Sequence, residues 1–204
     1  MPNTKAEFTR LLQERSLQPE RATEIDAAIY ANFGVTRAVL VMDMTGFSRM
    51  TLSHGLIHFL TMIHRMNEVA QPVIERHGGL LVKFEADNVF AVFPTVDQAI
   101  ETAQDLINCL HAANSVLPDE MDMRGKFGIG HGEILLIEDT DFFGSEVNLA
   151  SKLGENLAAP DEVLLTQAAR LRVSSDATQF QLLTTTLSGM ELSYYRLAQE
   201  NIEA

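Results

Sequence analysis

The sequence has few of the residues that mark secreted or membrane-bound proteins. Its single cysteine, Cys109, cannot form an internal disulfide, which is typical of a reducing compartment. The longest apolar runs, Ala38–Met42 and Ile134–Ile137, are far shorter than the roughly 20 residues that a membrane span needs. The first residues also lack the apolar stretch of an export signal. We therefore expect a cytoplasmic protein with no membrane partner.

Basic residues are scarce. The chain carries 15 Lys and Arg against 28 Asp and Glu, a formal net charge of −13. Such a surface repels phosphate backbones, so we expect no nucleic-acid partner and disfavour a polymerase-like domain that grips a template. With only 12 Gly and 6 Pro in 204 residues and 46% hydrophobic residues, the chain has the composition of a folded protein with a substantial core.

Residues 1–34 are predicted to form a helical extension, separate from a main domain over residues 35–204. Pro19 divides the extension into two helices, and apolar residues of the second recur at spacings of three and four up to Phe33. Gly34 is then expected to end this helix as a C′ residue. The extension is interpreted as a cover for one side of the core, with a dimerisation or regulatory helix as the alternative.

The main domain alternates strand and helix patterns. The expected elements are a strand over 38–42, a helix ending near 76, a hairpin over 80–93 with its turn at 85–88, a helix opening at the capping box of Thr95 and Gln98, a strand over 126–137, a helix over about 146–157, and later strands near 163–165 and 194–198. This order predicts an α+β fold with a ferredoxin-like βαββαβ core, extra C-terminal strands and flanking helices. Gly128, Gly130 and Gly132 lie inside a strand, so we interpret them as sites of close backbone packing rather than a dinucleotide loop.

Two aspartates lie where strands of this core end. Asp43 follows the buried first strand, and Asp87 lies in the hairpin turn. In a βαββαβ sheet the first strand neighbours the hairpin, so the two carboxylates can converge on hard cations, which prefer oxygen ligands and accompany triphosphates. The alternative is that each aspartate caps its own local backbone, as most turn aspartates do.

Four ordered motifs resemble the catalytic domain of class III nucleotidyl cyclases. They are VMDMTGFS (41–48), GGLLVKFEADNVFAVF (78–93), KFGIGHGE (126–133) and DFFGSEVNLASKL (141–153). The resemblance implies an adenylate cyclase, a phosphorus–oxygen lyase that converts ATP to 3′,5′-cyclic AMP and pyrophosphate for signalling. Two Mg²⁺ or Mn²⁺ ions per site would be held by Asp43, Asp87 and the backbone of Met44.

The same resemblance assigns the remaining site residues. The backbone at Thr45, Gly46 and Phe47 would cradle the β- and γ-phosphates, at a strand-to-helix turn that suits anions. Asn148 would position the ribose. Lys126 would bind the terminal phosphates and Lys152 would stabilise the transition state.

Lys83 and Asp141 match the pair that reads the base in adenylyl cyclases. Adenine presents an acceptor, N1, beside a donor, the 6-amino group, which an ammonium and a carboxylate complement. Guanine presents the opposite polarity and would leave both side chains facing like partners. Cytosine shares the polarity of adenine, so only the size of the pocket would reject it.

The family's site forms between two protomers, so the resemblance implies a homodimer. One protomer would supply Asp43, Asp87 and Lys126, and the other Lys83, Asp141, Asn148 and Lys152.

The chain departs from the family at several positions. Lysines 126 and 152 replace arginines and lose the planar bidentate fork. Ala86 replaces a glycine, which is tolerable if its φ is negative, and the segment between Glu133 and Asp141 is short. These departures leave two alternatives, a weak or inactive nucleotide-binding or regulatory module, and a cyclase for another nucleoside triphosphate.

Overall fold

The computed structural model describes residues 1–45, 52–118, 121–174, 179–187 and 190–198. The elements run in the order α1 (Lys5–Leu17), the 3₁₀ turn η1 (Pro19–Arg21), α2 (Ala22–Phe33), β1 (Gly34–Met44), α4 (Leu56–Arg76), β2 (Leu80–Glu85), β3 (Asn88–Phe93), α5 (Val96–Asn114), β4 (Gly125–Ile137), β5 (Asp141–Phe143), α6 (Ser145–Lys152), the π-helical turn η3 (Leu153–Leu157), β6 (Val163–Thr166), α7 (Gln167–Arg170), β7 (Phe180–Leu187) and β8 (Met190–Leu197). No helix among the described residues is both long and apolar enough to cross a membrane.

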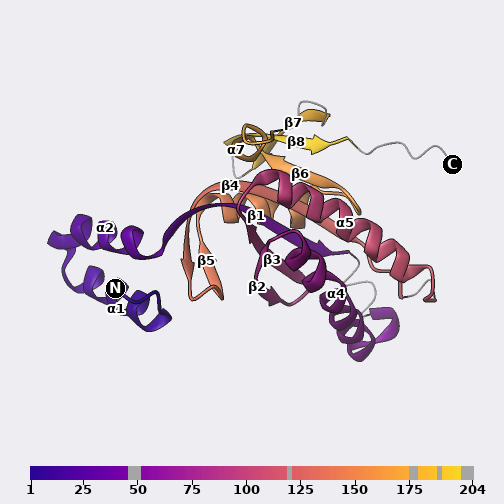
Figure 1. The fold of residues 1–204 in the computed structure, drawn as a ribbon, viewed down its shortest axis with the longest axis horizontal. Helices are drawn as coiled ribbons and strands as arrows, with labels where there is room; N and C mark the ends of the chain where they lie inside the picture. The colour runs from indigo at the N-terminus through magenta and orange to yellow at the C-terminus, as the bar shows by residue number, and fades with distance from the viewer. Residues whose placement is uncertain (46–51, 119–120, 175–178, 188–189, 199–204) are drawn as a thin grey trace.

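The strands form one mixed sheet in the order β2-β3-β1-β4-β6-β8-β7, with β5 added to β4 (Figure 1). β1 lies between β3 and β4 and is antiparallel to both, while β4 pairs with β6 in parallel. The first four strands of this order, β2-β3-β1-β4, are the arrangement that a ferredoxin-like βαββαβ unit produces. The α+β fold and its C-terminal strands are therefore confirmed.

Helices cover both faces of the sheet. The apolar sides of α4 and α5 pack on one face against alternate residues of β1, among them Leu40 and Met42. α6 packs on the other face, where Val147 and Ala150 contact Val39 and Val41. β1 is buried on both faces for this reason, as its uninterrupted apolar run predicts. The predicted capping box at Thr95 and Gln98 also forms and begins α5.

The glycines of β4 allow α6 to approach the sheet closely. A Cβ on Gly128 would lie 2.0 Å from the carbonyl oxygen of Ala150, and one on Gly130 would lie 2.6 Å from that of Glu146. The prediction of close backbone packing is therefore confirmed, and α6 is fixed against the strand that carries Lys126.

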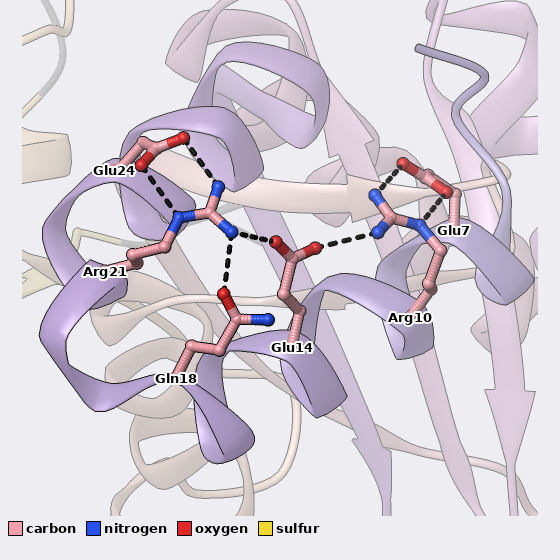
Figure 2. Close-up of polar contacts among 6 residues, drawn as sticks. All are labelled: Glu7, Arg10, Glu14, Gln18, Arg21 and Glu24. Atoms are coloured by element: carbon pink, nitrogen blue, oxygen red, sulfur yellow. Dashed lines mark hydrogen bonds and ion pairs between the residues drawn. The ribbon is translucent and has the colours of Figure 1, made fainter.

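The N-terminal helices pack at the end of β4, beside the β4–β5 hairpin (Figure 1). Their buried residues form a small cluster with Ile137 of β4: Leu11, Ile25, Ile29 and Phe33. A polar network joins the helices on the outside, in which Arg21 bridges Glu14 of α1 at 2.8 Å and Glu24 of α2 at 2.7 Å (Figure 2). Exposed pairs of this kind contribute little energy each, so the apolar cluster supplies most of the stabilisation.

Three local expectations need correction. Gly34 does follow the last helical residue, but it is extended, with φ −72°, and is the first residue of β1. A glycine is needed there because a Cβ would lie 2.4 Å from the carbonyl oxygen of Tyr30. Asp141 falls between the expected strand over 126–137 and the expected helix over 146–157, but it begins the short strand β5, and that helix widens into a π-turn after Lys152.

Candidate active site

The first part of the candidate site is the C-terminal end of β1. Asp43 pairs with Asn88 of β3 on one side and with Lys126 of β4 on the other. Residues 39, 41 and 43 alternate with the residues packed under α4 and α5, so Asp43 belongs to the α6 face. On this face, the buried apolar residues of β1 thus end at the carboxylate of Asp43, at the edge of the core.

Lys126 neutralises Asp43 directly. Its ammonium forms an ion pair with Oδ2 of Asp43 and donates a hydrogen bond of 2.8 Å to the carbonyl oxygen of Glu155. Their side chains are only 13% exposed for Asp43 and 17% for Lys126, so solvent screens this pair weakly. The residue predicted to bind terminal phosphates therefore contacts a predicted metal ligand.

Asp87 is brought to the same place by the β2–β3 turn. The amide of Met44 donates to the backbone carbonyl of Asp87 at 3.1 Å, which ties the turn to the end of β1. Ala86, just before it, has φ +53°, so the negative φ that would make alanine tolerable is not present. An L-residue in this conformation costs about 1–2 kcal/mol, and the turn stores that strain beside the site.

Burial and neighbouring negative charge both disfavour the charged forms of Asp43 and Glu155. Burial raises the pKa of Asp43, and the charge of Asp87 raises it further, while Lys126 partly opposes both. Burial also raises the pKa of the Glu155 carboxyl, and the charges of Asp43 and Asp87 add to this effect. The end of β1 therefore carries more negative charge than Lys126 offsets, which is an environment that attracts cations.

The donor set fits a hard divalent cation that is shared with substrate. The described residues contain no group of three or more His, Cys, Asp or Glu side chains spaced to hold a metal. Mg²⁺, however, is usually bound by one or two carboxylates together with substrate phosphates rather than by a cage of protein ligands. Asp43 and Asp87 supply two carboxylates and Met44 a nearby backbone carbonyl, all of them oxygen donors.

The second part of the site is a polar pair between β2 and β5. Nζ of Lys83 donates to Oδ1 of Asp141 at 3.0 Å and forms an ion pair with Oε2 of Glu85 at 2.9 Å. Partial burial works against the charge of Lys83, but the bonds to Glu85 and Asp141 raise its pKa overall. The two residues predicted to read the base are therefore brought together, 58 positions apart in the sequence.

The other predicted residues lie apart from these contacts or outside the described ranges. Asn148 and Lys152 are on α6, where Asn148 is exposed and Lys152 is half-buried, and neither side chain bonds to another described residue in the structure. The amide of Thr45 donates to the carbonyl of Arg124 at 3.0 Å, so it is already engaged. The predictions for Gly46 and Phe47 fall outside the described residues.

Two acidic residues of the site were not predicted. Glu85 contacts Lys83, and the alternation of a strand, which places residues 83 and 85 on one side, could have indicated it. Glu155 contributes its carbonyl to Lys126 and its carboxyl to the local potential. No sequence pattern indicates Glu155, because the π-turn that carries it was expected to be regular helix.

Several known proteins that are similar to this chain are nucleotide cyclases. No protein-family model matches the chain. A Rhizobium meliloti (strain 1021) protein named "Putative adenylate cyclase 3" is 35% identical over 129 residues, 63% of this chain and 22% of that protein. An uncharacterized protein of Mycobacterium tuberculosis is 29% identical over 68% of this chain and 34% of its own length. The chain thus spans between a fifth and about a third of these relatives.

Solved structures share the fold. The adenylyl cyclase CyaB from P. aeruginosa superposes with a TM-score of 0.68 at 16% identity, covering 84% of this chain and 98% of that one. A protein described as adenylate/guanylate cyclase/hydrolase from Silicibacter pomeroyi superposes with a TM-score of 0.66 at 24% identity, covering 82% of this chain and 98% of that one. The chain therefore has the fold of class III adenylyl and guanylyl cyclase catalytic domains.

Proposed function

We propose that this chain is an adenylate cyclase domain that converts ATP to 3′,5′-cyclic AMP and pyrophosphate in a homodimer. The observation that carries the proposal is the pairing of Lys83 with Asp141, in a fold that cyclases of both base specificities share. Asp43 and Asp87 at the end of β1 support the same activity.

The carboxylates of Asp43 and Asp87, with the backbone of Met44, would hold Mg²⁺ or Mn²⁺. When bound, two such ions lower the pKa of the attacking ribose hydroxyl and neutralise charge on the triphosphate. The chain's own contribution is to hold the two carboxylates together, through the register of β1 with β3 and the bond from Met44 to Asp87. Lys126 would carry positive charge to the phosphates once it leaves Asp43.

Lys83 and Asp141 retain the bonding capacity that adenine needs. An ammonium has three donors, of which Lys83 uses one for Asp141 and one for Glu85, so one N–H is left for N1 of the base. Oδ1 of Asp141 accepts from Lys83 and from the amide of Phe142, which leaves Oδ2 to accept from the 6-amino group. Guanine would set donor against donor and acceptor against acceptor.

The dimer would assemble complete sites from two incomplete halves. Asp43, Asp87 and Lys126 would come from one protomer, and Lys83, Asp141, Asn148 and Lys152 from its partner. Asn148 is exposed on α6 and is therefore available to the ribose of a nucleotide held by the partner. A C₂ dimer would then contain two equivalent sites, and a monomer none.

One observation favours a second function, a nucleotide-binding module with little turnover. Lys126 is held by Asp43 and by the carbonyl of Glu155, and a lysine lacks the bidentate fork with which arginine grips phosphate. A domain whose phosphate-binding cation stays on its metal ligand would position the phosphates poorly, so it would hold nucleotide through its other contacts but react slowly.

The proposal is tested by product identification. The purified chain is incubated with ATP, GTP, CTP and UTP in separate reactions with Mn²⁺ or Mg²⁺, at concentrations where a dimer is detected, and products are identified by mass spectrometry. Cyclic AMP with released pyrophosphate is expected from ATP. Metal-dependent ATP binding without any cyclic product would support the binding module instead, and a cyclic product from another nucleotide alone would refute the assignment of the base.

A further inference from the structure

The turn between β4 and β5 is strained. The amide of Thr140 donates to the carbonyl of Ile137 at 3.0 Å, and the two residues between them, Glu138 and Asp139, have φ of +51° and +57°. Turns with two positive φ values favour Asn-Gly, and a long side chain such as that of Glu138 is disfavoured there. The turn therefore needs support from elsewhere to keep one conformation.

That support comes from the first residues of the chain. The side-chain amide of Asn3 donates to the carbonyl of Leu136 at 3.0 Å, and its oxygen accepts from the amide of Glu138 at 3.0 Å. The two bonds span 133 and 135 positions of sequence. They satisfy the carbonyl of Leu136 and the amide of Glu138, which lie on either side of Ile137, the first residue of the turn. Asn3 thus pairs with the end of β4 much as a neighbouring strand would.

Two apolar contacts bind the same hairpin to the N-terminal helices. Ile137, at the start of the turn, is buried among residues of α1 and α2. Phe8 of α1 stacks on Phe143 of β5, with ring centroids 5.8 Å apart and planes 12° apart. Both sides of the β4–β5 hairpin therefore contact residues 1–33.

The same turn determines where Asp141 lies. Asp141 is the first residue of β5 and pairs with Ile137 across the hairpin. Its carboxylate contacts Lys83 of β2. In the sheet order, β3 and β1 separate β2 from β4, the strand with which β5 pairs. A change in the turn would move the carboxylate directly, because only Thr140 lies between Asp139 and Asp141.

We propose that the N-terminal helical segment positions the base-reading carboxylate of Asp141, and that Asn3 is the positioning residue. This inference rests on the proposed function for its effect on nucleotide choice, while the support of the turn by Asn3 stands on its own. A signal that shifts α1 and α2 would then alter substrate preference or affinity without touching the metal-binding end of β1.

The test compares full-length variants. Asn3→Ala removes both bonds to the turn, and the matched control Arg10→Gln removes only exposed ion pairs within α1. A rescue variant adds Glu138→Asn and Asp139→Gly to Asn3→Ala, so that the turn accepts positive φ without support. Hydrogen exchange of residues 136–142 is measured for each, together with kcat and KM for ATP and GTP.

We expect Asn3→Ala to speed exchange in this segment about 25-fold, roughly five-fold for each of the two ordinary hydrogen bonds that are lost. We also expect it to raise KM for ATP more than it lowers kcat and to reduce the preference for ATP over GTP about three-fold or more. The rescue variant should restore both, and Arg10→Gln should change neither.

Unchanged exchange in Asn3→Ala would overturn the proposal, as would faster exchange with an unchanged nucleotide preference. A wild-type chain that makes no cyclic nucleotide would refute the proposed function instead. The support of the turn by Asn3 would then be judged by exchange alone, and faster exchange reversed by the rescue variant would sustain it.

Discussion

Exchanging the charges of Lys83 and Asp141 should reverse the choice of base. The double variant Lys83→Glu/Asp141→Lys keeps an acid and a base in contact between β2 and β5, at positions that lie 3.0 Å apart in the wild type. It exchanges the donor and acceptor that face the nucleotide. N1–H of guanine would then meet a carboxylate and O6 an ammonium, while adenine would meet like partners.

The magnitude follows from counting the mismatched contacts. Each unpaired buried polar group costs about 1–3 kcal/mol, and the wrong base mismatches two of them. The wild type should therefore favour ATP over GTP by about 2–6 kcal/mol, or roughly 30-fold to 10⁴-fold in kcat/KM. Because the side chains of Lys83 and Asp141 are 30% and 29% exposed, the lower end of this range is expected.

The assay measures kcat/KM for ATP and GTP in the wild type, in both single variants and in the double variant. Lys83→Glu alone adds a third acid beside Glu85 and Asp141, so it should lower activity with both nucleotides. Glu85→Gln serves as the control, because it removes a partner of Lys83 without changing the polarity toward the base. An active double variant that still prefers ATP as strongly as the wild type would refute the reasoning.

Three further predictions concern the packing and charges around the site. Gly128→Ala should destabilise folding by about 3 kcal/mol, because the added Cβ meets the backbone of Ala150. The control Gly132→Ala should cost less, because its Cβ meets only the flexible side chain of Glu146. Equal midpoints of urea unfolding for the two variants would contradict this prediction. Ala86→Gly should stabilise the chain by up to about 1 kcal/mol by relieving its positive φ, and a loss of stability would argue against strain at the turn. Asp43→Asn should reduce cyclase activity on the order of 10³-fold or more. Since the folded pKa of Asp43 is raised above 3.8, the proton-linked stability that this carboxyl adds in acid is lost as pH rises through the folded pKa. The stability of Asp43→Asn relative to the wild type should therefore increase as pH rises through the folded pKa of Asp43. Denaturation curves at a series of acidic pH values that show no such increase would contradict a raised pKa for this carboxyl.

Sequence patterns predicted most of the core because local and long-range preferences agree there. Sequence alone indicates a strand from the apolar run of β1, and helices from the apolar stripes of α4 and α5 and the capping box at Thr95. The same apolar residues are the ones buried in the fold. The glycines of β4 were interpreted correctly because they lie within a strand. The pairing of Lys83 with Asp141 was expected from the family resemblance, and no periodicity would have suggested it.

The differences occur where tertiary contacts override local preference. Glu138 and Asp139 adopt positive φ against their own preference, in a turn where Asn3 accepts from the amide of Glu138 and Ile137 packs against the N-terminal helices. Residues 141–143 form β5 only because this turn folds them back on β4. Lys126 contacts Asp43 because β1 and β4 align the two residues, a register that cannot be read from either strand alone.

The proposal that each site is shared between protomers is tested most directly by complementation. Asp43→Asn disables the metal-binding half, and Asp141→Lys disables the base-reading half, because it places a second ammonium beside Lys83 and sets a donor against the 6-amino group of adenine. The two variants, each carrying a different affinity tag, are unfolded together and refolded as a mixture, and copurification of both tags shows that heterodimers form. Each variant alone should be inactive, whereas the mixture should regain about a quarter of wild-type cyclase activity, because half of the dimers would hold one intact site out of two. A mixture that forms heterodimers but stays as inactive as its components would contradict a site built from two protomers.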